Sequence, residues 1–265
     1  MACPQPVKLS RTDHERVWGI SVPGDKKLGE VWYTAEPPLP ILVKLLFTSD
    51  KLSVQVHPEG ECGVGKTEMW HILGAAPGAQ IALGFKQPVG AAALRAAALS
   101  GEIERLVRWI PVHPGETYFI PAGTIHAIGS GITLCEIQQN SDITYRLYDY
   151  GRPRELHLDR ALEAANLGAW LHPGARVAQD LPDGWKRLAE CRHFAADSKE
   201  VKAYMTYVAN PSTFELLIAL KGSGQLNGER FDAHEGWLLP AGAPIEIAPE
   251  TTLQVLRTYV PSPDS

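Results

Sequence analysis

The sequence predicts an all-β protein built from two β-barrel units, with a short helical excursion from the first unit. Three observations favour this fold class. Short apolar runs recur along the chain, turn residues separate them about every ten residues, and one strand–turn pattern occurs in both halves. The 265 residues, 45% of them hydrophobic, are enough for two modest cores.

The first half is dominated by predicted strands. Val, Leu and Phe are concentrated in residues 39–58, around a Ser-Asp-Lys turn, and further short apolar runs follow between Gly and Pro. These runs are EMWHILGA (68–75), AQIALGFK (79–86), ETYFIPAG (116–123), HAIGSGITLCEIQQ (126–139) and DITYRLYDY (142–150).

Two stretches interrupt the strand pattern. Residues 88–108 are rich in Ala, Leu and Glu. Leu99, Ile103 and Leu106 recur at helical spacing, Leu94, Ala97 and Ala98 do so just before them, and Ser100-Gly101 is an interruption. Residues 157–168 are predicted to form another helix, which ends at Gly168. We therefore expect one or two short helices in the first stretch and one more between two β units.

The second half returns to strands and contains an echo of the first. HEGWLLPAG (234–242) resembles HPGETYFIPAG (113–123), but Ile245 stands at the distance from the glycine where the first half has His126. Two barrels of related design explain this, although Pro-Ala-Gly is also a common turn that could recur by chance. The predicted domains are residues 1–165, which bind metal and carry a helical insertion at about 88–110, and residues 166–265, a β domain without metal ligands.

Charge and composition exclude several classes of partner. The formal net charge of −5 argues against nucleic acid or an anionic membrane as the main partner. No run of 18 apolar residues and no secretory leader are evident, so we expect a cytoplasmic protein. The four cysteines are widely scattered, which favours reduced thiols.

Three segments contain candidate metal ligands. Gln55 and His57 point to one face of a strand, because side chains alternate with a period of two. Glu68 follows a glycine-rich turn, and a hairpin would bring it to His57. His126 follows the tight turn in G-x5-P-x-G-x2-H, which places it at a strand end near a barrel mouth. Taken singly, each of these residues has an ordinary structural explanation, but together they offer two nitrogen and two oxygen donors.

The donor set suits zinc and accepts other divalent ions as well. Its context resembles the type I mannose-6-phosphate isomerases in their short bacterial form, from about residue 8 to residue 165. The segments that carry the resemblance are LSVQVHP, GKTEMW, IALGFK, PAGTIHAIG and EIQQNSDITYRLYDYGR, in the family's order. The resemblance implies a cupin (jelly-roll) fold with one Zn²⁺ per chain, and the family's ligand pattern falls on Gln55, His57, Glu68 and His126.

Aldose–ketose isomerisation also needs a base, an electrophile and a clamp for the phosphate. The resemblance implies an active-site role for Arg146 in SDITYR, whose alternative is a surface ion pair with Asp142 or Asp149. Glu136 is the candidate base, and its alternative is a structural carboxylate. For Lys66 the candidate roles are phosphate binding and proton transfer, and the alternative is a solvated lysine in a turn. Lesser candidates are Lys44 and Arg152. We expect His71, His113 and His157 in turns or on the surface, and Asp142, Asp149 and Asp159 in solvent.

The sequence thus predicts an isomerase of mannose 6-phosphate and fructose 6-phosphate, with a small-molecule sugar phosphate as its partner. The alternatives are an isomerase of other aldoses or sugar phosphates, an iron-dependent cupin oxygenase, and a non-catalytic sugar-binding cupin. An oxygenase would use His57, Glu68 and His126 as a two-histidine, one-carboxylate set. The positive charges at Lys66 and Arg146 favour a phosphosugar.

Overall fold

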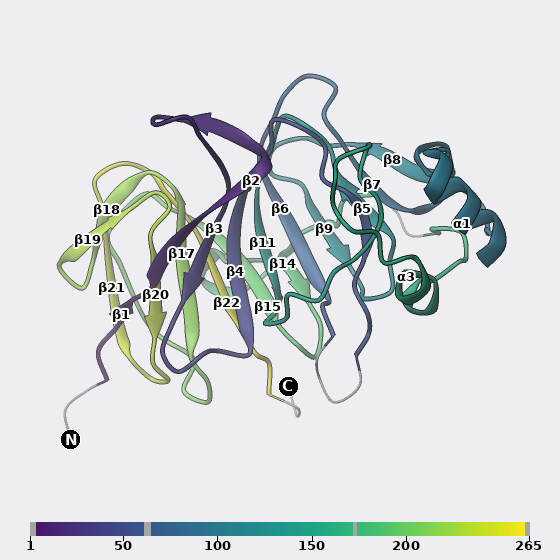
Figure 1. The fold of residues 1–265 in the computed structure, drawn as a ribbon. Helices are drawn as coiled ribbons and strands as arrows, with labels where there is room; N and C mark the ends of the chain where they lie inside the picture. The colour runs from purple at the N-terminus through teal and green to yellow at the C-terminus, as the bar shows by residue number, and fades with distance from the viewer. Residues whose placement is uncertain (1–3, 61–64, 172–173, 263–265) are drawn as a thin grey trace. The chain divides into compact units, whose positions relative to one another are not determined.

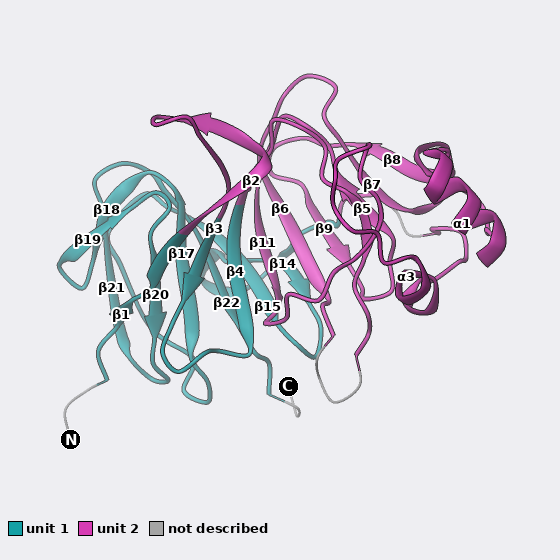
Figure 2. Ribbon diagram, viewed as in Figure 1, with its two compact units in different colours: residues 1–12, 31–45, 176–265 teal, residues 13–30, 46–175 magenta. Residues whose placement is uncertain are grey.

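The computed structural model describes residues 4–60, 65–171 and 174–262, and its chain divides into two compact units (Figures 1 and 2). Unit 1 comprises residues 1–12, 31–45 and 176–265, and unit 2 comprises residues 13–30 and 46–175. Antiparallel strands make up most of the regular structure in both, which confirms the all-β prediction. The predicted domain boundary between residues 165 and 166 stays a prediction.

Unit 2 is a β-sandwich whose two sheets enclose one apolar core. A five-stranded sheet has the order β12-β5-β10-β7-β8, and strand β6 pairs with β9 on one side and with β11 on the other. Large apolar side chains from both layers, such as Trp70, Ile81 and Leu134, pack in one cluster. The strands are β5 (Val54–Val56), β6 (Glu68–Ala75), β7 (Gln80–Phe85), β8 (Val107–Pro111), β9 (Thr117–Ile120), β10 (His126–Ile128), β11 (Ile132–Gln139) and β12 (Tyr145–Tyr148).

The helices of unit 2 cover the outer face of the five-stranded sheet (Figure 1). Val54 and Val56 point outward from β5 and pack in a cluster with buried helix residues, so the alternating Gln55 and His57 point into the barrel. Helix α1 (Ala91–Ser100) ends at Gly101, whose φ of 84° is left-handed, and α2 (Ile103–Leu106) follows. The predicted interruption at Ser100-Gly101 is confirmed.

Helix α3 (Leu158–Ala164) is shorter than predicted, because the backbone is already extended at Ala165 rather than continuing to Gly168. The helical spacing predicted for the first stretch is confirmed at Leu94, Ala97 and Ala98, which form the buried face of α1. Leu99 departs from that face, because it is 66% exposed.

Unit 1 is a second β-sandwich. A seven-stranded sheet in the order β1-β20-β17-β22-β15-β14-β13 and a four-stranded sheet in the order β16-β21-β18-β19 share a core that includes Leu217, Phe231 and Ile247. A single 3₁₀ turn, η1 (Pro182–Gly184), precedes β14. The strands are β1 (Val7–Lys8), β13 (Gln179–Asp180), β14 (Lys186–Glu190), β15 (Ala195–Val201), β16 (Met205–Val208), β17 (Glu215–Lys221), β18 (Ser223–Leu226), β19 (Glu229–Asp232), β20 (Gly236–Leu239), β21 (Pro244–Pro249) and β22 (Leu253–Tyr259).

Three strands contribute residues to both units: β2 (Ser10–Val22), β3 (Lys26–Thr34) and β4 (Ile41–Phe47). Cys135 and Cys191 are free thiols, as predicted, and Cys3 and Cys62 lie outside the described residues. Within the described part of the chain, no helix is both long enough and apolar enough to cross a membrane.

Candidate metal and active site

The two histidines singled out from the sequence meet inside unit 2. His126 begins β10 and lies opposite Gln55 of the neighbouring β5, while His57 follows β5 directly. The turn before β10 is hydrogen-bonded to His57, because Gly123 donates its backbone N–H to the His57 carbonyl at 2.7 Å. The two imidazole rings therefore lie with their centroids 4.7 Å apart, and both side chains are about 1% exposed.

Glu68, the first residue of β6, completes this group. Its carboxylate oxygens lie 3.6 Å from Nε2 of His57 and 3.6 Å from Nε2 of His126, and the residue is fully buried. The hairpin predicted before it falls largely on residues 61–64, outside the described residues, but the predicted meeting of Glu68 with His57 occurs. The ligand atoms of the three residues all lie within 4.8 Å of one another, so this group can hold a metal ion.

Hydrogen bonds to the other ring nitrogens prepare both histidines for this role. Nδ1 of His57 lies 2.8 Å from the Ile143 carbonyl, and Nδ1 of His126 lies 2.8 Å from the Thr124 carbonyl. A carbonyl only accepts, so Nδ1 carries the proton and Nε2 presents its lone pair toward Glu68. Burial lowers the pKa of His126 to about 4, which keeps its ring neutral near pH 7. Neutral imidazoles that share one buried carboxylate fit a divalent cation.

Gln55 lies at the edge of this group. Its side-chain amide nitrogen is 3.3 Å from Nε2 of His126, and its amide oxygen accepts a hydrogen bond from Ser53 at 3.0 Å. A 180° rotation of the amide exchanges the two atoms, which would bring the oxygen toward the group. Gln55 is thus within reach as a fourth ligand.

Lys66 connects this group with a second buried carboxylate. Its ammonium donates to Glu68 at 2.6 Å and lies 3.6 Å from Glu136, and Trp70 donates its indole N–H to the other Glu136 oxygen at 2.9 Å. Burial alone would lower the pKa of Lys66, but the charges of Glu136 and Glu68 outweigh it and raise the pKa. Lys66 is therefore a cation at neutral pH. It is only 5% exposed, so the solvated turn residue considered from the sequence is excluded.

Arg146 comes to the site from β12, where it lies opposite Gln55. Its Nη1 donates to the Glu155 carbonyl at 2.8 Å, and its buried Nε has no hydrogen-bond partner among the described residues. Asp149 is not its ion-pair partner, because that carboxylate is held by two 2.6 Å hydrogen bonds from Arg154. The structure thus places Arg146 beside Gln55 in the pair formed by β5 and β12.

Several polar residues differ from expectation. Asp149, predicted in solvent, is 2% exposed and ion-paired to Arg154. His71, predicted in a turn or on the surface, is 3% exposed in β6 and lies 2.9 Å from Oγ1 of Thr117. The first five residues of β6, Glu68 to Ile72, are all buried, so neither face of this part of the strand meets solvent. Sequence reasoning also missed the hydrogen bond from Trp70 to Glu136, which depends on strand register between segments 66 residues apart.

Comparison with known proteins agrees with this geometry. The chain is 40% identical over 151 residues to mannose-6-phosphate isomerase of Streptococcus mutans, a match that covers 50% of this chain and 48% of that protein. It is 34% identical over 221 residues to the mannose-6-phosphate isomerase ManA of Bacillus subtilis, covering 77% of this chain and 70% of ManA. The chain spans about half the length of three of the four curated relatives that it matches. No protein-family model matches it.

Solved structures give the same result. The mannose 6-phosphate isomerase of Bacillus subtilis aligns with a TM-score of 0.82 and 26% identity, over 96% of this chain and 99% of that one. A variant of phosphomannose isomerase from Salmonella typhimurium aligns with a TM-score of 0.76 over 97% of this chain, and at 15% identity it speaks for the fold alone. With a relative that is 34% identical and covered over more than two thirds of its length, the chain belongs to the mannose-6-phosphate isomerase family, and its fold is the two-unit cupin fold expected from the sequence.

Proposed function

We propose that this protein interconverts mannose 6-phosphate and fructose 6-phosphate, with one zinc ion held by Gln55, His57, Glu68 and His126. The single observation that carries the proposal is the buried chain Glu68–Lys66–Glu136, in which one cation lies between two carboxylates. One carboxylate can serve a metal while the other stays available for proton transfer. Family membership supplies the substrate class.

The donor set supports zinc. Two neutral imidazoles, a carboxylate and an amide oxygen give four ligands from the preferred classes, and each histidine is oriented by a backbone carbonyl. A bound divalent cation would polarise the sugar carbonyl and hold neighbouring oxygens in place. The same donors accept other divalent metals, so reconstitution must decide between them.

The protein residues account for the proton transfer. The reaction moves a proton from C2 of the aldose to C1 of the ketose, and a hydroxyl proton passes from O2 to O1. Glu136 takes and returns the carbon-bound proton, with Oε2 fixed by Trp70 and the other oxygen facing Lys66. Lys66, as a buried cation, stabilises negative charge that develops on the sugar oxygens. Arg146 supplies a second cation at the neighbouring strand.

A coupled assay tests the proposal. The purified protein is assayed with mannose 6-phosphate, glucose 6-phosphate, ribose 5-phosphate and free mannose, before chelation, after chelation, and after addition of Zn²⁺, Fe²⁺ or Mn²⁺. We expect turnover of mannose 6-phosphate, loss on chelation, and restoration by zinc with about one ion per chain. Fully active metal-free protein would contradict the metal site. Preference for another sugar would contradict the substrate, and oxygen uptake with iron would favour the oxygenase alternative.

A further inference from the structure

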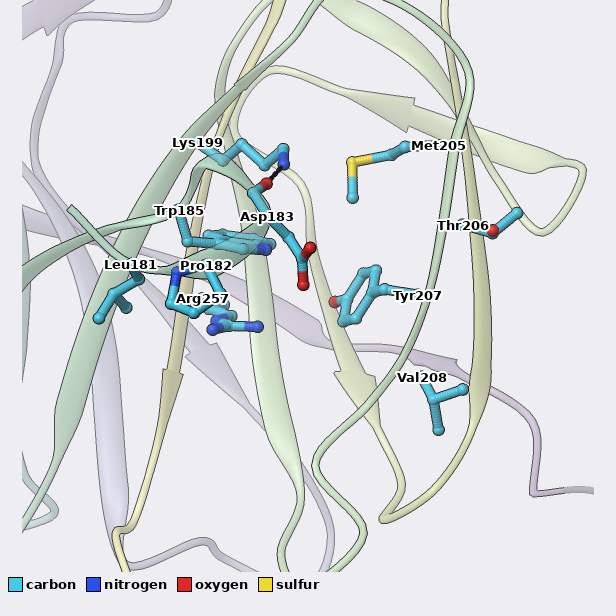
Figure 3. A pocket seen from close by; sticks show the side chains of 10 residues that line it. All are labelled: Leu181, Pro182, Asp183, Trp185, Lys199, Met205, Thr206, Tyr207, Val208 and Arg257. Atoms are coloured by element: carbon cyan, nitrogen blue, oxygen red, sulfur yellow. Dashed lines mark hydrogen bonds between the residues drawn. The ribbon is translucent and has the colours of Figure 1, made fainter.

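A hollow of about 680 Å³ opens in unit 1, between strands of its two sheets (Figure 3). Its walls come from β15 and β22 of the seven-stranded sheet, from β16 of the four-stranded sheet, and from the 3₁₀ turn η1. The volume lies within the range of small-molecule sites, roughly 300–1,000 Å³. The hollow belongs entirely to unit 1, and neither the metal-ligand group nor its neighbours contribute to it.

Strand register gives unit 1 a counterpart of Glu68, and two residues that line the hollow, Tyr207 and Arg257, lie next to it. In unit 2, Glu68 opens β6 and lies opposite Ile120, the last residue of β9. In unit 1, Glu215 opens β17 and lies opposite Leu239, the last residue of β20. Each of the two apolar partners is followed by the proline that begins a Pro-Ala-Gly turn. Glu215 is therefore the counterpart of Glu68.

The same comparison assigns a counterpart to the candidate base. Two residues beyond the glutamate, Trp70 of β6 lies opposite Glu136 of β11. Two residues beyond Glu215, Leu217 of β17 lies opposite Arg257 of β22. Arg257 lines the hollow, so a cation stands where the first unit has a carboxylate.

The buried glutamate of unit 1 contacts other polar groups of the protein where Glu68 of unit 2 contacts two histidines. Glu215 accepts hydrogen bonds from the Tyr207 hydroxyl at 3.3 Å and from the backbone N–H of Asn210 at 3.2 Å, and Nη1 of Arg257 lies 3.9 Å away. Among the described residues, the one group with metal-ligand geometry is that of unit 2. The glutamate of the second barrel is thus held by a tyrosine hydroxyl, a backbone N–H and an arginine.

Two cations are fixed at the wall of the hollow by one indole. The guanidinium of Arg257 lies 4.1 Å from the Trp185 ring centroid, and the ammonium of Lys199 lies 5.8 Å from it, on the opposite face (Figure 3). Arg257 is further held by Asp197, which accepts from Nε at 2.9 Å. Its Nη2 has no hydrogen-bond partner among the described residues, so it can donate to a ligand.

A carboxylate lies beside these donors in the hollow (Figure 3). Asp183 has a left-handed backbone, with φ 58° and ψ 21°, and its side chain points into the hollow on the side of Tyr207 (Figure 3). Its backbone carbonyl accepts a hydrogen bond from Lys199, while the described residues provide no ion pair for its carboxylate. Donors and an acceptor therefore converge on one small space that also has apolar walls at Leu181 and Met205.

The charges at this place favour a neutral ligand over an anionic one. Lys199, Arg257 and Arg187, which shares Asp197 with Arg257, are balanced by Asp183, Asp197 and Glu215. A phosphate dianion would have to approach the Asp183 carboxylate. A sugar hydroxyl avoids this cost, because it can donate to Asp183 and accept from Lys199 or Arg257. We propose that the hollow of unit 1 is a binding site for a neutral mono- or disaccharide.

Saturation-transfer NMR and tryptophan fluorescence with mannose, glucose and maltose as probes test the site. We expect binding with a dissociation constant on the order of 1 mM, typical of a small polar ligand. Asp183→Ala should weaken binding at least tenfold. Asp180→Ala is the matched control, because Asp180 is an exposed aspartate three residues away that does not line the hollow. Mannose 6-phosphate should bind this site more weakly than mannose.

A second pair of variants keeps the test decisive if Asp183→Ala fails to fold. Lys199→Ala should weaken binding, whereas Lys202→Ala, at an exposed lysine outside the hollow, should not. Equal sugar binding in Asp183→Ala and Asp180→Ala would place the sugar elsewhere and overturn the proposal. Absence of binding by all three probes would overturn it too, and tighter binding of the sugar phosphate at this site would overturn the neutral class.

Discussion

The two units contain the same turn, and the two copies differ in the side chain that follows it, a histidine in unit 2 and an isoleucine in unit 1. In unit 2, Thr124 donates its backbone N–H to the Pro121 carbonyl at 3.1 Å. In unit 1, Ala243 donates to the Pro240 carbonyl at the same distance. Each turn links the end of one strand with the start of the next, β9 with β10 and β20 with β21.

The copies also agree in their glycine and differ three residues later. Gly123 and Gly242 have left-handed φ angles of 81° and 70°, which a side chain would strain. The third residue after each glycine is about 1% exposed, but it is His126 in unit 2 and Ile245 in unit 1. The backbone therefore delivers a buried side chain to equivalent places, and in unit 2 that side chain is an imidazole that meets His57 and Glu68.

Replacing His126 gives the largest expected effect on this comparison. His126→Ala removes one of two imidazoles from the group, so metal affinity should fall by well over 100-fold, more than loss of a supporting hydrogen bond costs. Turnover should fall to background. Metal analysis and steady-state assays measure both. The melting temperature should change little, because the core is apolar and the metal is not a structural staple. A drop as large as that of a core truncation would contradict this.

Ile245→Ala is the matched control at the equivalent place of unit 1. It deletes buried apolar atoms, so the free energy of unfolding should fall by about 2–5 kcal/mol. Metal content and turnover per folded molecule should stay at wild-type values. If metal content fell with Ile245→Ala as it does with His126→Ala, the two positions would not differ in the way that the side chains indicate.

Arg146→Ala should reduce turnover next most strongly while metal binding persists. If the guanidinium contacts charge developing on the sugar oxygens, its removal lowers kcat by a factor on the order of 10²–10³. If it only clamps the phosphate, its removal mainly raises KM. We expect the loss mainly in kcat, and Arg146→Lys should restore it only in part, because an ammonium lacks the bidentate fork. The measurement is steady-state kinetics at confirmed full metal occupancy.

Near wild-type kinetics of Arg146→Ala would assign the arginine a structural role. Its hydrogen bond to the Glu155 carbonyl would then be its main contribution. Charge stabilisation would have to come from Lys66, with Arg152 as the next candidate. Arg152 is already engaged, since it donates to the Lys51 carbonyl at 2.6 Å.

Trp70→Phe should have a smaller effect, confined to unit 2. It removes the N–H that fixes Glu136, so kcat should fall about tenfold with little change in KM, as expected for a residue that positions a catalytic group. Tyr118→Phe is the control. Tyr118 lies opposite Trp70 in the strand pair, and its hydroxyl donates to Glu116 at 2.8 Å, away from the site. Both variants should lose about 1 kcal/mol of stability, and equal losses of kcat would refute the positioning role.

The sequence predicts local geometry well in this protein. The alternation of Gln55 and His57, the start of a strand at His126 and the helix break at Ser100-Gly101 all follow from rules that act within a few residues. Those rules hold here because the apolar and polar faces of these segments differ.

The remaining features depend on tertiary packing, strand register and loop path, which hydrophobic periodicity does not report. His71 is buried because both faces of strand β6 are covered from Glu68 to Ile72, and no period in the sequence reports that. The hydrogen bond between Trp70 and Glu136, and the ion pair between Asp149 and Arg154, need register and loop paths that local patterns do not encode. Leu99 repeats at helical spacing yet faces solvent, because a short Ala-rich helix offers more than one apolar face.

The smallest expected effect concerns His234, at the start of the strand–turn copy in unit 1. This residue has a left-handed φ of 67°, its carbonyl accepts from the Tyr33 hydroxyl at 2.8 Å, and its own N–H donates to the Ala219 carbonyl at 2.7 Å. Both hydrogen bonds use the backbone, so they survive a change of side chain. His234→Ala should therefore leave turnover per folded molecule unchanged. A loss of turnover beyond tenfold, about 1.4 kcal/mol of transition-state binding, would show that unit 1 takes part in the chemistry.

The His234→Gly variant should have a higher melting temperature than His234→Ala, because glycine avoids a left-handed backbone penalty of about 1 kcal/mol that alanine keeps. Thermal melts of the two variants test this ordering, and a higher melting temperature for the alanine variant would show that the backbone relaxes from the left-handed conformation when the imidazole is removed.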